Sequence, residues 1–200
     1  MKNENIDVET HLLSQGEIRI TLNDYIRVYY GVQILPLPKN LYDFIKTVMD
    51  YVLVHNDEMP YFGRINEYGN HMEKVFIEAL TKHFPDVKAE KLGGGYPDTR
   101  IKINNTWIYP EIKIAKDVYE VGSFRSFYTS RPKDVTKNIK NIQDGSHLLI
   151  HFEHNGPGRL TGRYRVSDMD GYEYTSYGCK QEGNTKDLYE NHNKVILESN

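Results

Sequence analysis

The sequence has few of the features that mark secreted, membrane-spanning or disulfide-bonded proteins. It holds one cysteine, Cys179, in 200 residues, and a single thiol that cannot form an internal disulfide is typical of a reducing cytosol. No apolar run approaches the roughly 18 residues needed to cross a bilayer. The N-terminal segment lacks the basic stretch followed by an apolar one that marks secretory signals. We therefore expect a cytoplasmic protein with no membrane partner.

The chain also lacks an excess of positive charge. It has 25 Lys and Arg against 28 Asp and Glu, a net charge of -3, so any attraction to DNA must come from a local basic surface. No internal repeat, low-complexity tract or Gly/Ser linker interrupts it. Because 200 residues suit one well-cored domain and are few for two, we expect a single domain. Its expected parts are a helical N-terminal part over about 20–84, a catalytic hairpin and sheet over about 87–178, and a C-terminal helix over about 185–198.

Several common catalytic motifs are absent. The sequence has no GxSxG, no dinucleotide fingerprint, no HNH-like pattern and no Cys/His zinc spacing. The glycine run 93–95 is not followed by the GKS or GKT of a nucleotide-binding loop. His151 and His154 are more typical of strand-end residues than of ligands, and Asp168 and Asp170 are more typical of a turn than of a calcium loop.

The spacing of apolar residues predicts an α/β chain. Asn23 and Asn40 are placed to cap two helices, and residues 1–19 are expected to form a loosely held start. The elements that we expect are helices over 22–30, 41–54, 67–84, 133–142 and 185–197, and strands over 87–92, 99–103, 107–114, 147–153, 159–169 and 172–177.

The segment 93–113 has the composition of a functional hairpin. Residues two apart on a strand share a face, so Glu111 and Lys113 should point together while Ile112 points into the core. Asp98 opens the preceding strand and should lie near the Glu111 end once the hairpin pairs. Two converging carboxylates repel each other unless a cation lies between them, and oxygen ligands without His or Cys suit Mg²⁺. The pattern predicts metal-assisted phosphodiester hydrolysis.

The helix expected before the hairpin carries a carboxylate among its apolar residues. Glu73 falls between Leu80 and Phe84 on the core-facing arc, where an unpaired charge costs free energy. Two interpretations remain open for this residue. It is either a boundary residue whose carboxylate reaches solvent, or an additional acidic group directed at the hairpin.

The order of these residues resembles the PD-(D/E)xK nuclease superfamily, best known from type II restriction endonucleases. Pro97-Asp98, twelve intervening residues and Glu111-Ile112-Lys113 match its signature, and the run from Gly69 to Glu73 resembles its GxxxE segment. A competing pair, Pro85-Asp86, ends a helix and opens no hairpin. The resemblance covers about residues 66–153. It implies a restriction-endonuclease-like fold, in which a mixed β-sheet is flanked by helices.

The resemblance also implies roles for individual residues. Asp98 and Glu111 would be ligands of Mg²⁺, and the carbonyl of Ile112 a further one. Lys113 would position and activate the attacking water, and Glu73 would be an auxiliary acid.

A basic and aromatic segment follows the hairpin. Between residues 124 and 140 lie five basic residues and one acidic residue, a local surplus that suits the DNA backbone. A solvated basic face is the competing interpretation. The DNA-binding candidates in this segment are Arg125, Ser126, Tyr128, Arg131, Lys133 and Lys137.

The sequence therefore favours a Mg²⁺-dependent type II restriction endonuclease that cuts double-stranded DNA at a specific short site in the cytoplasm of a prokaryote. A homodimer is expected, because two-fold DNA sites need two active centres. A repair or junction-resolving nuclease of the same superfamily is a second hypothesis. A non-catalytic DNA-binding or structural module, with Glu111 and Lys113 as a plain ion pair, is a third.

Overall fold

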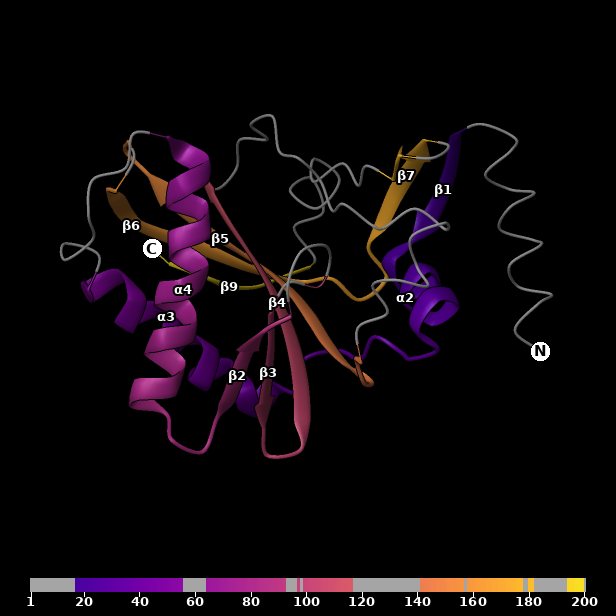
Figure 1. Cartoon of the computed structure of the whole chain (residues 1–200), viewed down its shortest axis with the longest axis horizontal. Coiled ribbons are helices and arrows are strands. Elements are labelled where there is room, and N and C mark those ends of the chain that lie inside the picture. Colours follow the sequence, from indigo (N-terminus) through magenta and orange to yellow (C-terminus); the bar gives the residue numbers. More distant parts are fainter. Residues whose placement is uncertain are drawn as a thin grey trace.

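The computed structural model (Figure 1) has a central mixed β-sheet with helices packed against one face. A smaller sheet and a short helix stand beside it. None of the described helices is long and apolar enough to cross a membrane. The residues that the structure describes are 17–55, 64–92, 97, 99–116, 141–156, 158–177, 180–181 and 194–199.

The central sheet has six strands and is mostly antiparallel, in the order β2-β3-β4-β5-β6-β9. Only the pair β4–β5 is parallel, and a parallel pair needs a long crossover connection. The register of that pair sets Glu111 opposite Leu149 and Lys113 opposite His151. The strands are β2 (Lys88–Lys91), β3 (Thr99–Ile103), β4 (Thr106–Ala115), β5 (Gly145–His154), β6 (Leu160–Asp168) and β9 (Val195–Glu198).

Two helices cover one face of this sheet (Figure 1). They are α3 (Tyr42–Val54), which follows the short 3-10 helix η1 (Lys39–Leu41), and α4 (Ile65–His83). Helix α4 buries a stripe in which every fourth residue is apolar, and full burial of one large apolar side chain stabilises the fold by about 1.5–3 kcal/mol. That stripe consists of Tyr68, Met72, Phe76 and Leu80, each fully buried.

The opposite face of the sheet packs against a second apolar cluster. Helix α2 (Leu22–Tyr30) contributes Leu22 and Ile26, and the sheet contributes Tyr109 and Leu149. The strand that leads into α2 belongs to a three-stranded sheet with the order β1-β7-β8. The bounds of that sheet's strands are β1 (Glu17–Thr21), β7 (Glu173–Tyr177) and β8 (Lys180–Gln181).

Strand β5 starts at a glycine because no side chain fits there. A Cβ atom added at Gly145 would lie 2.5 Å from the carbonyl oxygen of Trp107 and 2.9 Å from the Tyr109 ring. Real Cβ atoms do not approach backbone oxygens this closely. The close contact holds the start of β5 against the start of β4.

The predicted hairpin is confirmed, with its turn at Asn104 and Asn105. Their φ angles are 45° and 65°, and two consecutive positive φ angles are the mark of a two-residue type I′ turn. Asparagine tolerates this left-handed backbone better than most residues. The strand expected over 107–114 starts one residue earlier than predicted, at Thr106.

Both predicted helix caps are wrong. Thr21 caps α2, because its hydroxyl accepts a hydrogen bond from the amide of Asp24 at 3.0 Å. Asn23 instead tethers the helix, since its amide donates to Asp170 and its carbonyl accepts from the amide of Gly171, each at 2.7 Å. Asn40 lies inside η1, and no side chain caps α3.

Two predictions for the ends of the chain are also wrong in part. The C-terminal helix expected over about 185–198 is contradicted at its end, where 195–198 form strand β9 against β6. Register pairing with a neighbouring strand overrides the helical spacing of the apolar residues. Residues 17–19 of the expected loose start lie in β1. Most of the helix expected over 133–142 lies outside the described residues.

The turn gives a prediction that tests the hairpin itself. Asn105→Gly should keep or raise the free energy of unfolding, because Asn-Gly is the preferred pair for this turn. Asn105→Val should lower it by about 1–2 kcal/mol, because a β-branched residue resists the left-handed backbone. Urea titration of both variants measures the difference, and equal stability would contradict the turn assignment.

A buried histidine gives a second prediction. His147 is fully buried and stacks on Tyr109 with ring centroids 4.7 Å apart, and burial lowers its pKa from 6.5 to about 3. Between those two values the unfolded chain binds a proton that the folded chain does not. Stability should therefore fall as pH drops through this window.

For this one residue the loss approaches about 1.4 kcal/mol per pH unit. His147→Phe removes the titrating ring and keeps its aromatic shape. The variant should show a shallower dependence of unfolding free energy on pH between about 5.5 and 4, whatever its stability at neutral pH. An unchanged slope in urea titrations would refute the role of His147.

Candidate active site

Glu111 and Lys113 lie side by side on β4, as the strand alternation predicts. The Lys113 ammonium donates a hydrogen bond to Oε1 of Glu111 in an ion pair. The Glu111 side chain is 7% exposed and that of Lys113 is 21% exposed. Ile112 and Ile114 between and beyond them are buried in the core on the helix side. The carboxylate and the ammonium therefore share the face opposite to α3 and α4.

The second oxygen of the Glu111 carboxylate lacks a hydrogen-bond donor among the described residues. Oε2 is buried and accepts no hydrogen bond from any of the described residues. A buried carboxylate oxygen without a donor is costly, and a cation beside it would remove that cost. The residues described here therefore fit a metal ion at Glu111, although among them no three His, Cys, Asp or Glu side chains gather into a complete site.

Asp98, the other predicted metal ligand, lies outside the described residues. Its neighbours Pro97 and Thr99 are both buried. Thr99 is the first residue of β3, and β3 pairs with β4 so that Ile101 faces Ile108. The β3–β4 pairing ends at Ile101, and continuing its register for two more residues would bring Thr99 level with Pro110, immediately before Glu111.

Glu73 lies on α4, and its described contact is not with the hairpin acid. Its carboxylate accepts from the Lys91 ammonium at 2.7 Å, and its side chain is 12% exposed. The inward position on the helix is as predicted. Helix α4 packs on the opposite side from Glu111, since a Cβ at Gly69 would contact Ile114 at 3.9 Å. The structure therefore joins Glu73 to the edge strand β2 through an ion pair.

The predicted DNA-binding residues Arg125, Ser126, Tyr128, Arg131, Lys133 and Lys137 all lie outside the described residues.

Sequence reasoning missed a row of polar residues that continues from Lys113 across the sheet. His151 on β5 pairs in register with Lys113, and Arg165 on β6 pairs with His151. Burial first, and then the charges of Lys113 and Arg165, lower the pKa of His151 to about 3. The alternation of polar and apolar residues in 151–153 and 163–167 was the available signal for this row.

The chain matches the family model of the type II restriction enzyme MjaV over residues 16–192. A curated relative, described as "Type II restriction enzyme MjaV" from Methanocaldococcus jannaschii, is 26% identical over 179 aligned residues. That alignment covers 76% of this chain and 77% of the relative. The matched region contains the hairpin, its ion pair and the polar row beside it. The chain therefore belongs to the type II restriction enzyme MjaV family.

Proposed function

We propose that this protein is a Mg²⁺-dependent endonuclease that hydrolyses phosphodiester bonds of double-stranded DNA at a specific short sequence. Family membership gives the class of enzyme, and the relative is named as a type II restriction enzyme. The observation that carries the proposal is the buried Glu111 carboxylate. One of its oxygens holds Lys113, and the other accepts no hydrogen bond from the described residues.

Three groups would hold the metal in this proposal. They are the carboxylates of Asp98 and Glu111 and the carbonyl of Ile112, all oxygen ligands of the kind that Mg²⁺ prefers. The bound ion would lower the pKa of a coordinated water and polarise the phosphate. The apolar packing of Ile112 and Ile114 on the helix side fixes the strand that presents the ligands.

Lys113 supplies a positive side-chain charge beside the proposed metal site. Its ammonium is held against Glu111, so it would lie within reach of a water that occupies the metal site. A cation at this position orients the attacking water and stabilises charge that develops on the phosphate. In the same proposal Glu73 is an auxiliary acid that acts from the neighbouring helix, and its ion pair with Lys91 holds its carboxylate in place.

The topology supports assignment to the PD-(D/E)xK superfamily with a restriction-endonuclease-like core. A helix that carries Glu73 precedes the antiparallel hairpin β3–β4, and β5 then joins β4 in parallel. In the same proposal, the segment 124–140 binds the DNA backbone. The proposal also includes a homodimer that acts in the prokaryotic cytoplasm, since a two-fold DNA site calls for two active centres.

The first test of the proposal is cleavage. The protein with Mg²⁺ should cut a long phage DNA into discrete fragments. Lys113→Ala and Asp98→Ala should each lower the cleavage rate by at least about 100-fold, because each removes charge stabilisation in the transition state. Lys74→Ala, at an exposed position of α4, is the matched control and should cut at the normal rate. Full activity in either site variant would overturn the assignment, and a smear would exclude sequence specificity.

The second test concerns the metal and does not depend on activity. Mg²⁺ should raise the unfolding temperature, because a ligand that binds only the folded state stabilises it by mass action. In Glu111→Gln the shift should be lost, whereas Glu78→Gln, on the exposed side of α4, should keep it. Thermal scans with and without Mg²⁺ measure the effect, and an equal shift in Glu111→Gln would rule out this carboxylate as a ligand.

A further inference from the structure

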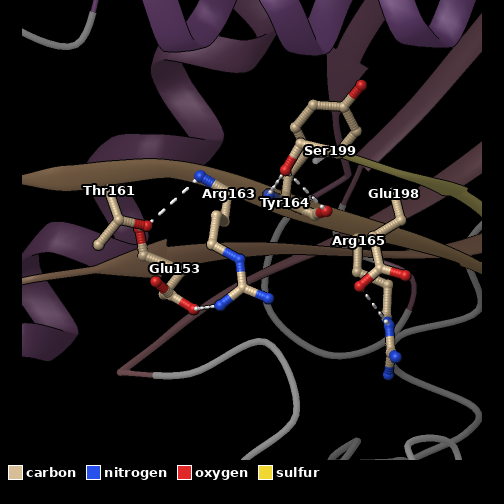
Figure 2. Close-up of polar contacts among 7 residues, drawn as sticks. All are labelled: Glu153, Thr161, Arg163, Tyr164, Arg165, Glu198 and Ser199. Atoms are coloured by element: carbon tan, nitrogen blue, oxygen red, sulfur yellow. Dashed lines mark hydrogen bonds and ion pairs between the residues drawn. The ribbon is translucent and has the colours of Figure 1, made fainter.

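A second cationic group lies on the same face of the sheet as Lys113. Arg163 and Arg165 are two apart on β6, so both side chains leave the same side of the strand. Figure 2 shows them extending together, while Tyr164 between them points the other way, toward the helices. Because Arg165 is joined in register through His151 to Lys113, both arginines share the face of the candidate active site.

Arg163 is held at both ends. Its guanidinium donates from Nη1 to Oε2 of Glu153 at 3.0 Å. Its backbone amide donates to Oγ1 of Thr161 at 3.3 Å, and that hydroxyl in turn donates to the carbonyl of Glu153. Two anchors on one residue reduce the entropy that the side chain loses on binding a ligand. The guanidinium is therefore oriented before any partner arrives.

The two side chains of the Arg163–Glu153 pair differ in their exposure to solvent. The Arg163 side chain is 39% exposed, whereas that of Glu153 is 11% exposed. The neighbouring pair has the reverse arrangement, since the Arg165 side chain is buried and that of Glu198, 3.9 Å away, is 32% exposed. Of Lys113, Arg163 and Arg165, Arg163 is the most exposed, and Lys113 follows at 21%. The positive end of the Arg163–Glu153 pair thus faces solvent, and its negative end faces the sheet.

We propose that Arg163, oriented by Glu153, binds a backbone phosphate of the DNA beside the cut site. The proposal rests on the endonuclease function proposed above. A guanidinium carries five donors in a planar fork, so a phosphate can bind it while Glu153 stays in place. Arginine is also the cation best suited to two-point contact with phosphate oxygens. Glu153 is then a positioning residue.

The geometry of the sheet gives the distance between the backbone positions of Lys113 and Arg163. Strands β4 and β6 are separated by β5, so they lie two strand spacings apart. Arg163 lies two residues from Arg165, which is the residue of β6 level with Lys113. With about 4.8 Å between strands and about 3.3 Å per residue, the two backbone positions are about 12 Å apart. One DNA strand rises about 3.4 Å per nucleotide. The phosphate that Arg163 binds should therefore lie within about four nucleotides of the scissile one.

The test compares salt dependence of DNA binding, measured without Mg²⁺ so that no cleavage occurs. Arg163→Gln should weaken binding several-fold and reduce the slope of log K against log salt by about 0.9, the value for one lost phosphate contact. Arg163→Lys should keep most of the slope, because the charge remains. Arg27→Gln is the matched control, since Arg27 is an exposed arginine that also pairs with a carboxylate, that of Asp24, but stands on α2. Its slope should equal that of the unchanged protein.

A double variant excludes a purely structural ion pair. Arg163→Gln leaves Glu153 buried without its partner, so a loss of stability alone could weaken binding. Arg163→Gln/Glu153→Gln removes both charges and should still show the reduced slope. Recovery of the original slope in the double variant, or an unchanged slope in Arg163→Gln, would overturn the assignment of Arg163. If the unchanged protein binds no DNA at any salt concentration, the proposed function itself fails.

Discussion

Strand β4 presents its side chains in turn to two different environments. Ile112 and Ile114 point into an apolar core against α3 and α4, and Glu111 and Lys113 point to the opposite face. The alternation is a property of the extended backbone and cannot be changed for one residue without moving its neighbours. The packing of the isoleucines therefore holds the carboxylate and the ammonium in place.

Beside its apolar cluster, the opposite face is polar at a depth where proteins are usually apolar. Glu111, His151 and Arg165 are all buried there, and charged groups at such depth are tolerated only when they are paired. Lys113, Arg163 and Arg165 each have a carboxylate within contact distance. An apolar layer of similar volume would give comparable or greater stability. The needs of the fold alone therefore do not explain the charge at this place, which agrees with the function proposed for the site.

The local geometry of the hairpin could be predicted from the sequence, because strand alternation and a two-residue turn are local properties. The hairpin, the pairing of Glu111 with Lys113 and the inward position of Glu73 all depend on residues a few positions apart. The contacts of Glu73 with Lys91 and of Lys113 with its neighbour His151 join separate segments, and no local pattern specifies them. The strand at 195–198 was missed for the same reason, since its conformation is set by pairing with β6. The caps failed because Thr21 and Asn23 are both good capping residues, and Asn23 is engaged by a distant turn.

Gly145 has a consequence that reaches well beyond its own contact. Gly145 is the one residue of β5 without a side chain, so its backbone can approach the carbonyl of Trp107 closely. If β5 slipped by two residues, a side chain from Gln143 or His147 would meet that carbonyl, so the misaligned sheet would be strained at its start. His151 lies six residues further along, about 20 Å at about 3.3 Å per residue. The absence of a side chain at Gly145 thus favours one register of β5 against β4. Because that register continues along the strand, Gly145 at one end favours His151 as the neighbour of Lys113 near the other end.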